Sequence, residues 1–274
     1  MVKVIDTDKL FDDYIKDYVY ENIGKVNPEE IENKMPVLYE EFGDKKLKEL
    51  DDKSPNEYYQ GFTANELLEC LKSHIDLGVP VSDFLVEAIT QKPDAESVAI
   101  KLLMDDLSEE FTLYLMNILS DLNSEKATSR YMEFILSDYS ETIKELATES
   151  LTQNADLVKD AIIENYAGAD DITKARFTEI LSNAKHDDKV FEILVNAFLS
   201  NPDQVQIYAN YLAKYGDERA LPFLETAIEK DKISYADFEE LRFAIEALGG
   251  EVNIKKDFSK DGTFKKITAK PDIN

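Results

Sequence analysis

The sequence has few or none of several residue types, and each shortage excludes a class of protein. Its 274 residues contain a single cysteine, Cys70, and no tryptophan. One cysteine cannot form a disulfide within the chain and fits a reducing compartment. No window approaches about 18 uncharged apolar residues, so a transmembrane helix is not expected, and the first residues lack the apolar core of a signal peptide. These features predict a cytoplasmic protein.

Positive charge is also in short supply. The chain has 31 lysines and arginines against 57 aspartates and glutamates, a formal net charge of -26. Such a surface repels phosphate groups, so direct binding to nucleic acid or to an anionic membrane is not expected. The acidity fits either of two roles: binding a protein or peptide with a basic surface, or keeping the chain soluble.

Glycine and proline are scarce, at 9 and 8 residues, which favours helix over sheet. Apolar residues recur at positions i, i+3, i+4 and i+7, with small polar clusters between the runs. Thr63 and Glu66 form a capping-box pattern at the start of one such run. The chain is therefore predicted to be all-α.

A repeat of 31 to 33 residues runs through most of the chain. Each unit predicts a first helix, a short polar turn and a second helix with a leucine near its end. The units are 92–122, 123–153, 154–184, 185–217 and 218–250, and the leucines are Leu119, Leu151, Leu181, Leu212 and Leu248. A sixth, less regular pair covers 61–91. A near-constant period with drifting sequence is typical of a stacked array.

One stretch carries a more specific resemblance. In "LAKYGDERALPFLETAIE", Gly216-Asp217-Glu218 follows a helix end, and Pro222 falls in the first turn of the next helix, where its missing N–H costs nothing. This stretch resembles the short bacterial form of the HEAT repeat, the type also seen in phycobilisome-lyase proteins. "LRFAIEALGG" at 241–250 is similar to the second helix of that family. The resemblance covers roughly 200–250 and implies a right-handed α-α superhelix, a solenoid of about six HEAT-like helix pairs.

Three parts are expected in the chain. Residues 1–60 predict a helical N-terminal cap, because a stripe that includes Leu10, Phe11 and Tyr14 can cover the open end of an array. An independent binding module is the alternative for this part. Residues 61–250 form the HEAT-like array. Residues 251–274 form a basic tail with six lysines against four acidic residues, either docked on the array or free. An Asp-Gly turn between alternating residues predicts a β-hairpin there.

No residue cluster makes a convincing metal, cofactor or catalytic site. Asp257, Ser259 and Asp261 resemble the first half of an EF-hand loop, but Thr268 stands where that loop needs a bidentate glutamate. We therefore favour the hairpin and leave cation binding at Asp257 and Asp261 open. Cys70 and His74 can share one helix face with Glu66, yet no orienting group or oxyanion site accompanies them, so a structural cysteine is predicted.

His186-Asp187-Asp188 also carries acidic side chains, but a second ligand cluster is missing. Acidic residues at this place suit the positive end of a helix dipole. We interpret the triplet as a helix start and not as a metal site. No cofactor is expected.

The candidate binding residues lie on the second helices, which line the concave face of a HEAT-like array. The exposed positions predicted there are Arg176, Glu179, Tyr208, Tyr211, Glu239 and Arg242. Tyrosine and arginine are common in binding hot spots, although the two tyrosines could instead pack between repeats.

The function predicted from these features is a non-catalytic scaffold whose acidic concave surface binds a basic protein or peptide. One alternative is a HEAT-like enzyme of the lyase or DNA-glycosylase type. The other is an acidic DNA mimic, which would carry regularly spaced carboxylates along one face.

Overall fold

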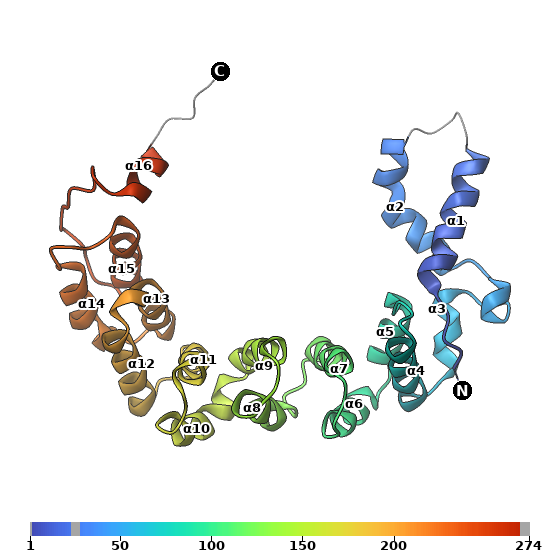
Figure 1. Ribbon diagram of the computed structural model, residues 1–274, viewed down its shortest axis with the longest axis horizontal. Helices are drawn as coiled ribbons and strands as arrows, with labels where there is room; N and C mark the ends of the chain where they lie inside the picture. Colours follow the sequence, from blue (N-terminus) through green and yellow to red (C-terminus); the bar gives the residue numbers. More distant parts are fainter. Residues whose placement is uncertain (1, 23–27, 269–274) are drawn as a thin grey trace. The chain divides into compact units, whose positions relative to one another are not determined.

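The computed structural model describes residues 2–22 and 28–268, which form helices joined by short turns (Figure 1). The chain divides into two compact units, Met1–Arg130 and Tyr131–Asn274. In the described part of the chain no strand forms, and a single isolated antiparallel bridge joins Leu47 to Lys53. The all-α prediction is therefore confirmed. None of the described helices is long and apolar enough to cross a membrane.

The first unit packs short helices around α4 and α5. α4 contacts α5, α6 and α7, while α1 packs along α2, and α2 contacts α3. Ring contacts of Phe42 and Tyr39 with Phe84 attach α2 to α5. The elements are α1 (Thr7–Glu21), α2 (Pro28–Gly43), η1 (Lys48–Leu50), α3 (Pro55–Tyr58), η2 (Tyr59–Gly61), α4 (Ala64–Leu77), α5 (Asp83–Thr90), α6 (Ala95–Leu103), α7 (Glu109–Asp121) and the first residues of α8 (Thr128–Leu136).

The second unit contains the rest of α8 and a series of helix pairs. Its elements are α9 (Glu141–Gln153), α10 (Ala155–Tyr166), α11 (Asp171–Leu181), α12 (Asp188–Ser200), η3 (Pro202–Gln204), α13 (Val205–Tyr215), η4 (Glu218–Ala220), α14 (Leu221–Ile228), α15 (Tyr235–Ala247) and α16 (Gly262–Thr268). Each repeat predicted from the sequence contains two of the observed α-helices. For example, 154–184 holds α10 and α11, and 185–217 holds α12 and α13.

Local sequence signals explain where these helices begin and end. The Thr63 N–H donates to Glu66 Oε2 at 2.9 Å, and the Glu66 N–H donates to Thr63 Oγ1 at 3.3 Å, which completes the predicted capping box of α4. Ser140 caps α9 by accepting from the Ile143 N–H. At the end of α13, Gly216 adopts a φ of 76°, a left-handed conformation that glycine adopts without a Cβ clash.

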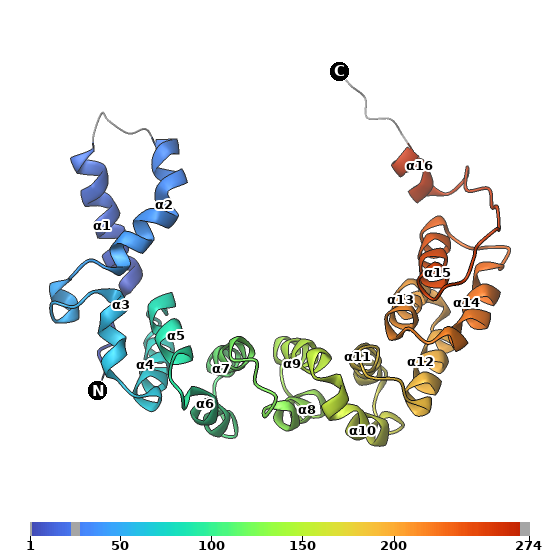
Figure 2. The same ribbon diagram turned by 180° about the vertical axis from the view of Figure 1, so that it is seen from behind.

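The helices of the second unit form two layers (Figures 1 and 2). We call α9, α11, α13 and α15 the first layer and α10, α12 and α14 the second layer. Within the first layer α9 contacts α11, α11 contacts α13, and α13 contacts α15. Phe177, Leu181 and Leu212 are buried between the layers, and each residue is at most 1% exposed. Apolar burial of this kind is the main force that stacks successive pairs.

Polar contacts connect successive pairs at about one repeat of separation. Gln206 on α13 donates to Asp237 on α15 at 2.7 Å, and the two residues are 31 positions apart. Asn210 donates to Glu240 at 3.3 Å across 30 positions. At this interface between α13 and α15, the separation in sequence matches the length of one repeat.

The C-terminal β-hairpin prediction is wrong. Residues 251–258 run without regular structure, and residues 262–268 form the short helix α16; residues 269–274 of the predicted tail lie outside the described part. The Asp261 carboxylate accepts from the Thr263 and Phe264 N–H groups at 2.8 and 3.0 Å, so it caps α16 instead of starting a hairpin turn. Its other oxygen accepts from the Tyr235 N–H at 3.2 Å and ties the tail to α15.

Aromatic packing completes the attachment of this tail. The Phe258 ring lies 5.3 Å from Tyr235 and 5.1 Å from Phe238, and Phe264 lies 5.1 Å from Tyr235, centroid to centroid. These ring contacts stabilise a tail that follows the surface of α15. A hairpin would be less stable here, because its two strands have no sheet to extend.

We expect Phe258→Ala to release the tail from α15, because it removes two of these ring contacts. Loss of about 1.4 kcal/mol of local packing raises the open population about tenfold. Tryptic cleavage at the tail lysines should accelerate by about that factor, measured by mass spectrometry of a digestion time course. Ile267→Ala, at a side chain that is 65% exposed, serves as the control. Equal cleavage rates in both variants and the parent would contradict this attachment.

Candidate binding site on the first layer

A hollow of about 720 Å³ lies over three neighbouring helices of the first layer. α9, α11 and α13 each contribute side chains at helical spacing, so each helix presents one solvent-facing row. The lining residues are Glu145, Thr148, Glu149, Thr152 and Gln153 from α9, Ile172, Ala175, Arg176 and Glu179 from α11, and Gln204, Ile207, Tyr208 and Tyr211 from η3 and α13. The hollow is of the size that accepts a small ligand or a few side chains.

The charge in the hollow is negative. Three of its lining residues are carboxylates, Glu145, Glu149 and Glu179, and one is cationic, Arg176. The Arg176 guanidinium already pairs with Glu141 at 2.6 Å, and its side chain is only 12% exposed. Within the described residues, the three lining carboxylates have no ion-pair partner. The site can therefore attract a cation that the protein itself does not supply.

Two tyrosines form one wall of the hollow. The rings of Tyr208 and Tyr211 meet edge to face with centroids 5.8 Å apart. Tyr208 is buried and Tyr211 half-buried. Burial, together with the nearby charge of Glu179, raises the pKa of Tyr211 to about 12. Both phenols therefore stay protonated at neutral pH, and an aromatic wall beside a carboxylate suits a cationic side chain.

Four of the six residues predicted from the sequence come together in this hollow: Arg176, Glu179, Tyr208 and Tyr211. The other two, Glu239 and Arg242, lie on α15 outside it. Arg242 forms ion pairs with Glu239 and, at 3.5 Å, with Glu246, all on the same helix. The α9 residues Glu145 and Glu149 were not predicted, although they occupy the equivalent second helix one repeat before Arg176 and Glu179.

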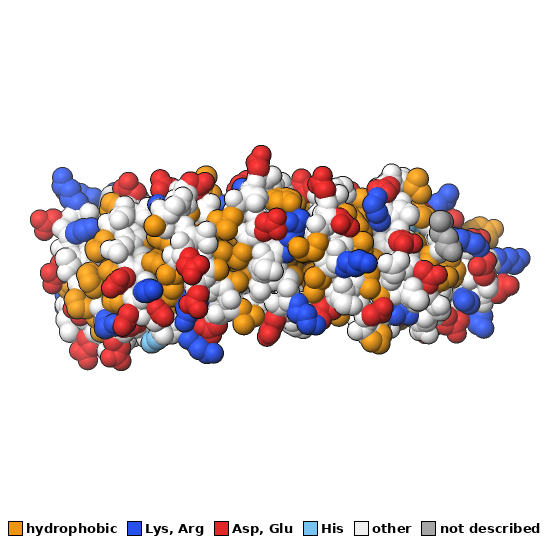
Figure 3. Space-filling view, turned by 90° about the horizontal axis from the view of Figure 1, so that it is seen from below, with side chains coloured by type: hydrophobic (Ala, Val, Ile, Leu, Met, Phe, Trp, Pro, Cys, Tyr) orange, Lys and Arg blue, Asp and Glu red, His pale blue; other side chains and the backbone are white. Residues whose placement is uncertain are grey.

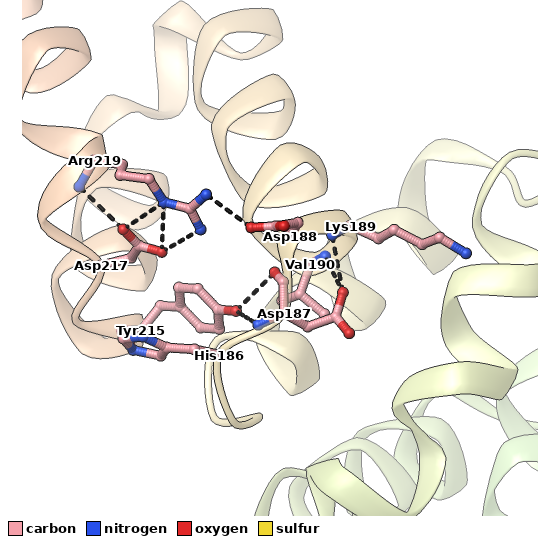
Figure 4. Close-up of polar contacts among 8 residues, drawn as sticks. All are labelled: His186, Asp187, Asp188, Lys189, Val190, Tyr215, Asp217 and Arg219. Carbon is pink, nitrogen blue, oxygen red and sulfur yellow. Dashed lines mark hydrogen bonds and ion pairs between the residues drawn. The ribbon is translucent and has the colours of Figure 1, made fainter.

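A second polar cluster joins the start of α12 to the end of α13 (Figure 4). The Tyr215 hydroxyl accepts from the Asp187 N–H at 2.6 Å and donates to the Asp187 carbonyl at 3.1 Å. His186 Nε2 donates to the Tyr215 carbonyl at 2.8 Å, and the two rings stack at 4.9 Å. The predicted helix start at His186–Asp188 is thus held by the second helix of the same repeat, 185–217.

Arg219 extends the same cluster (Figure 4). Its guanidinium donates hydrogen bonds to Asp217 through Nε and Nη2, the shortest at 2.7 Å. It also donates to Asp188 of the preceding repeat at 2.8 Å. It also lies 4.3 Å from the centre of the Phe191 ring. The charged groups of Arg219, Asp217 and Asp188 pair with one another, so we interpret the network as a structural clasp between repeats. Asp217, Glu218 and Arg219 lie in the stretch that resembles a HEAT repeat, and here Asp217 and Arg219 help to connect one repeat to the next.

Cys70 and His74 lie in the core of the first unit. Both are buried, at 3% and 0% exposure, and burial raises the pKa of the Cys70 thiol to about 11. The thiol donates to the Lys3 carbonyl at 3.6 Å, and His74 Nδ1 donates to the Pro80 carbonyl at 2.8 Å. Neither side chain reaches the other in a nucleophile–base pair, and Glu66 is used in the capping box of α4.

In the candidate cation loop of the tail, carboxylate oxygens of Asp257 and Asp261 accept hydrogen bonds from backbone N–H groups. Asp257 Oδ1 accepts from the Ser259 N–H at 2.9 Å, and Asp261 caps α16. Across the described residues, no group of three histidine, cysteine, aspartate or glutamate side chains is placed to hold a metal ion.

Charged side chains on another face of the helices follow no regular order. Figure 3 shows one face of each unit, on which acidic side chains alternate irregularly with basic and apolar side chains. This arrangement lacks the evenly spaced row of carboxylates that a DNA mimic would need on that face.

The comparisons with known proteins give no relative for this chain. No family model matches it, and no curated protein or solved structure is significantly similar to it. The resemblance to HEAT-like repeats therefore remains a prediction drawn from the residues quoted above.

We expect Cys70 to react slowly with thiol reagents in the folded protein, because a thiol pKa of about 11 leaves very little thiolate. At pH 8 the thiolate fraction falls from about one quarter for a free thiol to about one thousandth. Absorbance of the chromophore released from a disulfide reagent should rise at least about 100-fold faster after unfolding in guanidinium. Labelling of the native protein at a free-thiol rate would refute this assignment.

The clasp predicts a pH-dependent effect of Asp217→Asn. Hydrogen bonds from Arg219 lower the pKa of Asp217, so its stabilising charge is fully present above the unfolded pKa of about 4 and is lost as the pH falls through the folded value. At pH 7 the variant should lose about 1–3 kcal/mol of unfolding free energy, and the difference should shrink below about pH 4. Urea titrations at several pH values measure this, with the exposed Asp160→Asn as control. A pH-independent difference would be inconsistent with the clasp.

Proposed function

We propose that this protein is a non-catalytic binding scaffold that captures basic side chains of a partner protein or peptide in the hollow over α9, α11 and α13. The observation that carries the proposal is the presence there of Glu145, Glu149 and Glu179 without an ion-pair partner in the described residues. A cation entering the hollow would gain the attraction of these carboxylates.

The aromatic wall supports a protein ligand. Tyr211 offers a large, rigid contact surface at low entropy cost, and tyrosine is enriched in binding hot spots. In this reading the acidic residues speed up and orient the encounter, whereas Tyr211 contributes contact area. The chain's net charge of -26 extends the same attraction over a longer range.

The proposal includes the architecture. We propose that the helix pairs within the second unit follow the plan of a right-handed, HEAT-like α-solenoid. Repeating contacts from α9 to α15 support this, because each first-layer helix packs on the next. In such an array the second helices of successive pairs form a continuous binding surface. Here these are the helices of the first layer, over which the hollow lies.

We expect the triple variant Glu145→Gln, Glu149→Gln and Glu179→Gln to lose most of its binding to basic partners, because it removes charge from the hollow and keeps side-chain shape. Three partly exposed ion pairs of about 0.2–1 kcal/mol each predict a loss of about tenfold. The measurement is a paired affinity capture from cell lysate treated with nuclease, at low and high salt, with quantitative mass spectrometry.

The matched control is Glu164→Gln, Glu225→Gln and Glu229→Gln, an equal change of charge at exposed positions on or next to second-layer helices. Basic proteins should be retained by the parent and the control, lost by the hollow variant, and released at high salt. If the hollow variant and the control capture the same proteins as the parent, the hollow is not the binding site.

A further inference from the structure

Two aliphatic side chains stand exposed at the edge of the hollow. Ile172 is 64% exposed and Ile207 is 50% exposed, and both line the hollow. They occupy the first turns of α11 and α13. Other apolar side chains of these helices, such as Phe177 and Leu212, are buried. Exposed aliphatic side chains beside a polar pocket offer apolar area that a partner can cover.

On α11 the acidic and apolar side chains of the hollow are separated along the helix axis. Glu179 follows Ile172 by two turns on the same face of α11, which is about 10 Å of axial rise. On α13, Tyr211 follows Ile207 by about one turn, and Glu179 is near enough for its charge to act on the Tyr211 phenol. Because short turns join each helix pair, α11 and α13 run in the same direction, and their apolar ends lie on the same side.

The volume limits what can enter. About 720 Å³ holds a few side chains of one segment, and it is too small for a folded domain. One short stretch of chain can present all the basic and apolar groups that this volume holds. An α-helix does so with residues two turns apart on one face, which repeats the spacing between Ile172 and Glu179.

We propose that the hollow binds one face of a basic amphipathic helix of a partner protein. A lysine or arginine of that helix reaches Glu179 and the α9 carboxylates, Glu145 and Glu149. A leucine-type side chain two turns away covers Ile172 and Ile207. The inference rests on the proposed function and adds to it the shape and pattern of the ligand.

The test uses two synthetic helical peptides, each about 16 residues long, and the full chain. In the first peptide, lysines and leucines share one face and stand two turns apart. The second has the same composition, with lysines and leucines on opposite faces. Fluorescence anisotropy measures the binding of each peptide at low and high salt, and circular dichroism checks that both peptides have equal helicity.

We expect the first peptide to bind about tenfold more tightly than the second. Ile207→Ser should weaken the first peptide about fivefold at both salt concentrations, because the apolar contact is not screened. Glu179→Gln should weaken it only at low salt. The controls are Leu157→Ser, at an exposed leucine of α10, and Glu225→Gln on α14, and neither should change binding.

The outcomes separate this inference from the proposed function. If both peptides bind equally and Glu179→Gln weakens both, the acidic capture stands and the amphipathic ligand is overturned. If neither peptide binds, both proposals fail. Self-association of the chain that Ile207→Ser abolishes, measured by sedimentation, would assign the apolar edge to a second copy and overturn the inference alone.

Discussion

Burial of apolar stripes between successive helices holds the second unit together. No pair such as α10 and α11 can cover its own stripe, since Phe177 and Ile180 need the neighbouring pair to exclude water from them. Polar contacts between residues one repeat apart then fix the register of each pair against the next. The clasp of Arg219 with Asp217 and Asp188 and the Gln206–Asp237 contact do this between repeats 185–217 and 218–250, and the Arg176–Glu141 ion pair does it between 123–153 and 154–184.

This stacking also produces the candidate site. When the inward face of each first-layer helix packs against the second layer, its outward row is left to solvent. On α9, α11 and α13 these rows meet over one hollow, so side chains far apart in the sequence, such as Glu145 and Tyr211, come to share it. Within the described residues the three glutamates form no ion pair, which leaves their charge available to a ligand.

The helix pairs could be predicted from the sequence because periodicity, caps and turns act locally. The observed tail, with α16 in place of the predicted hairpin, could not, because the Asp261 carboxylate reaches the N–H of Tyr235, which is 26 residues away. Four candidate residues share the hollow because the repeat places the second helices of successive pairs side by side. The pairing of Arg176 with Glu141 was not predicted, because it depends on the offset between neighbouring helices and not on the period. The burial of Tyr208 matches the alternative that the two tyrosines pack between repeats.

The central claim is that the hollow over α9, α11 and α13 receives basic side chains. Isoleucine-methyl NMR of the full chain, titrated with a lysine-rich peptide, tests it most directly. Ile172 and Ile207 line the hollow, whereas Ile228 is buried in α14, at 1% exposure. The account predicts saturable shifts of the Ile172 and Ile207 methyl signals, with the Ile228 signal unchanged. Shifts confined to other isoleucines, while Ile172 and Ile207 stay still, would contradict it.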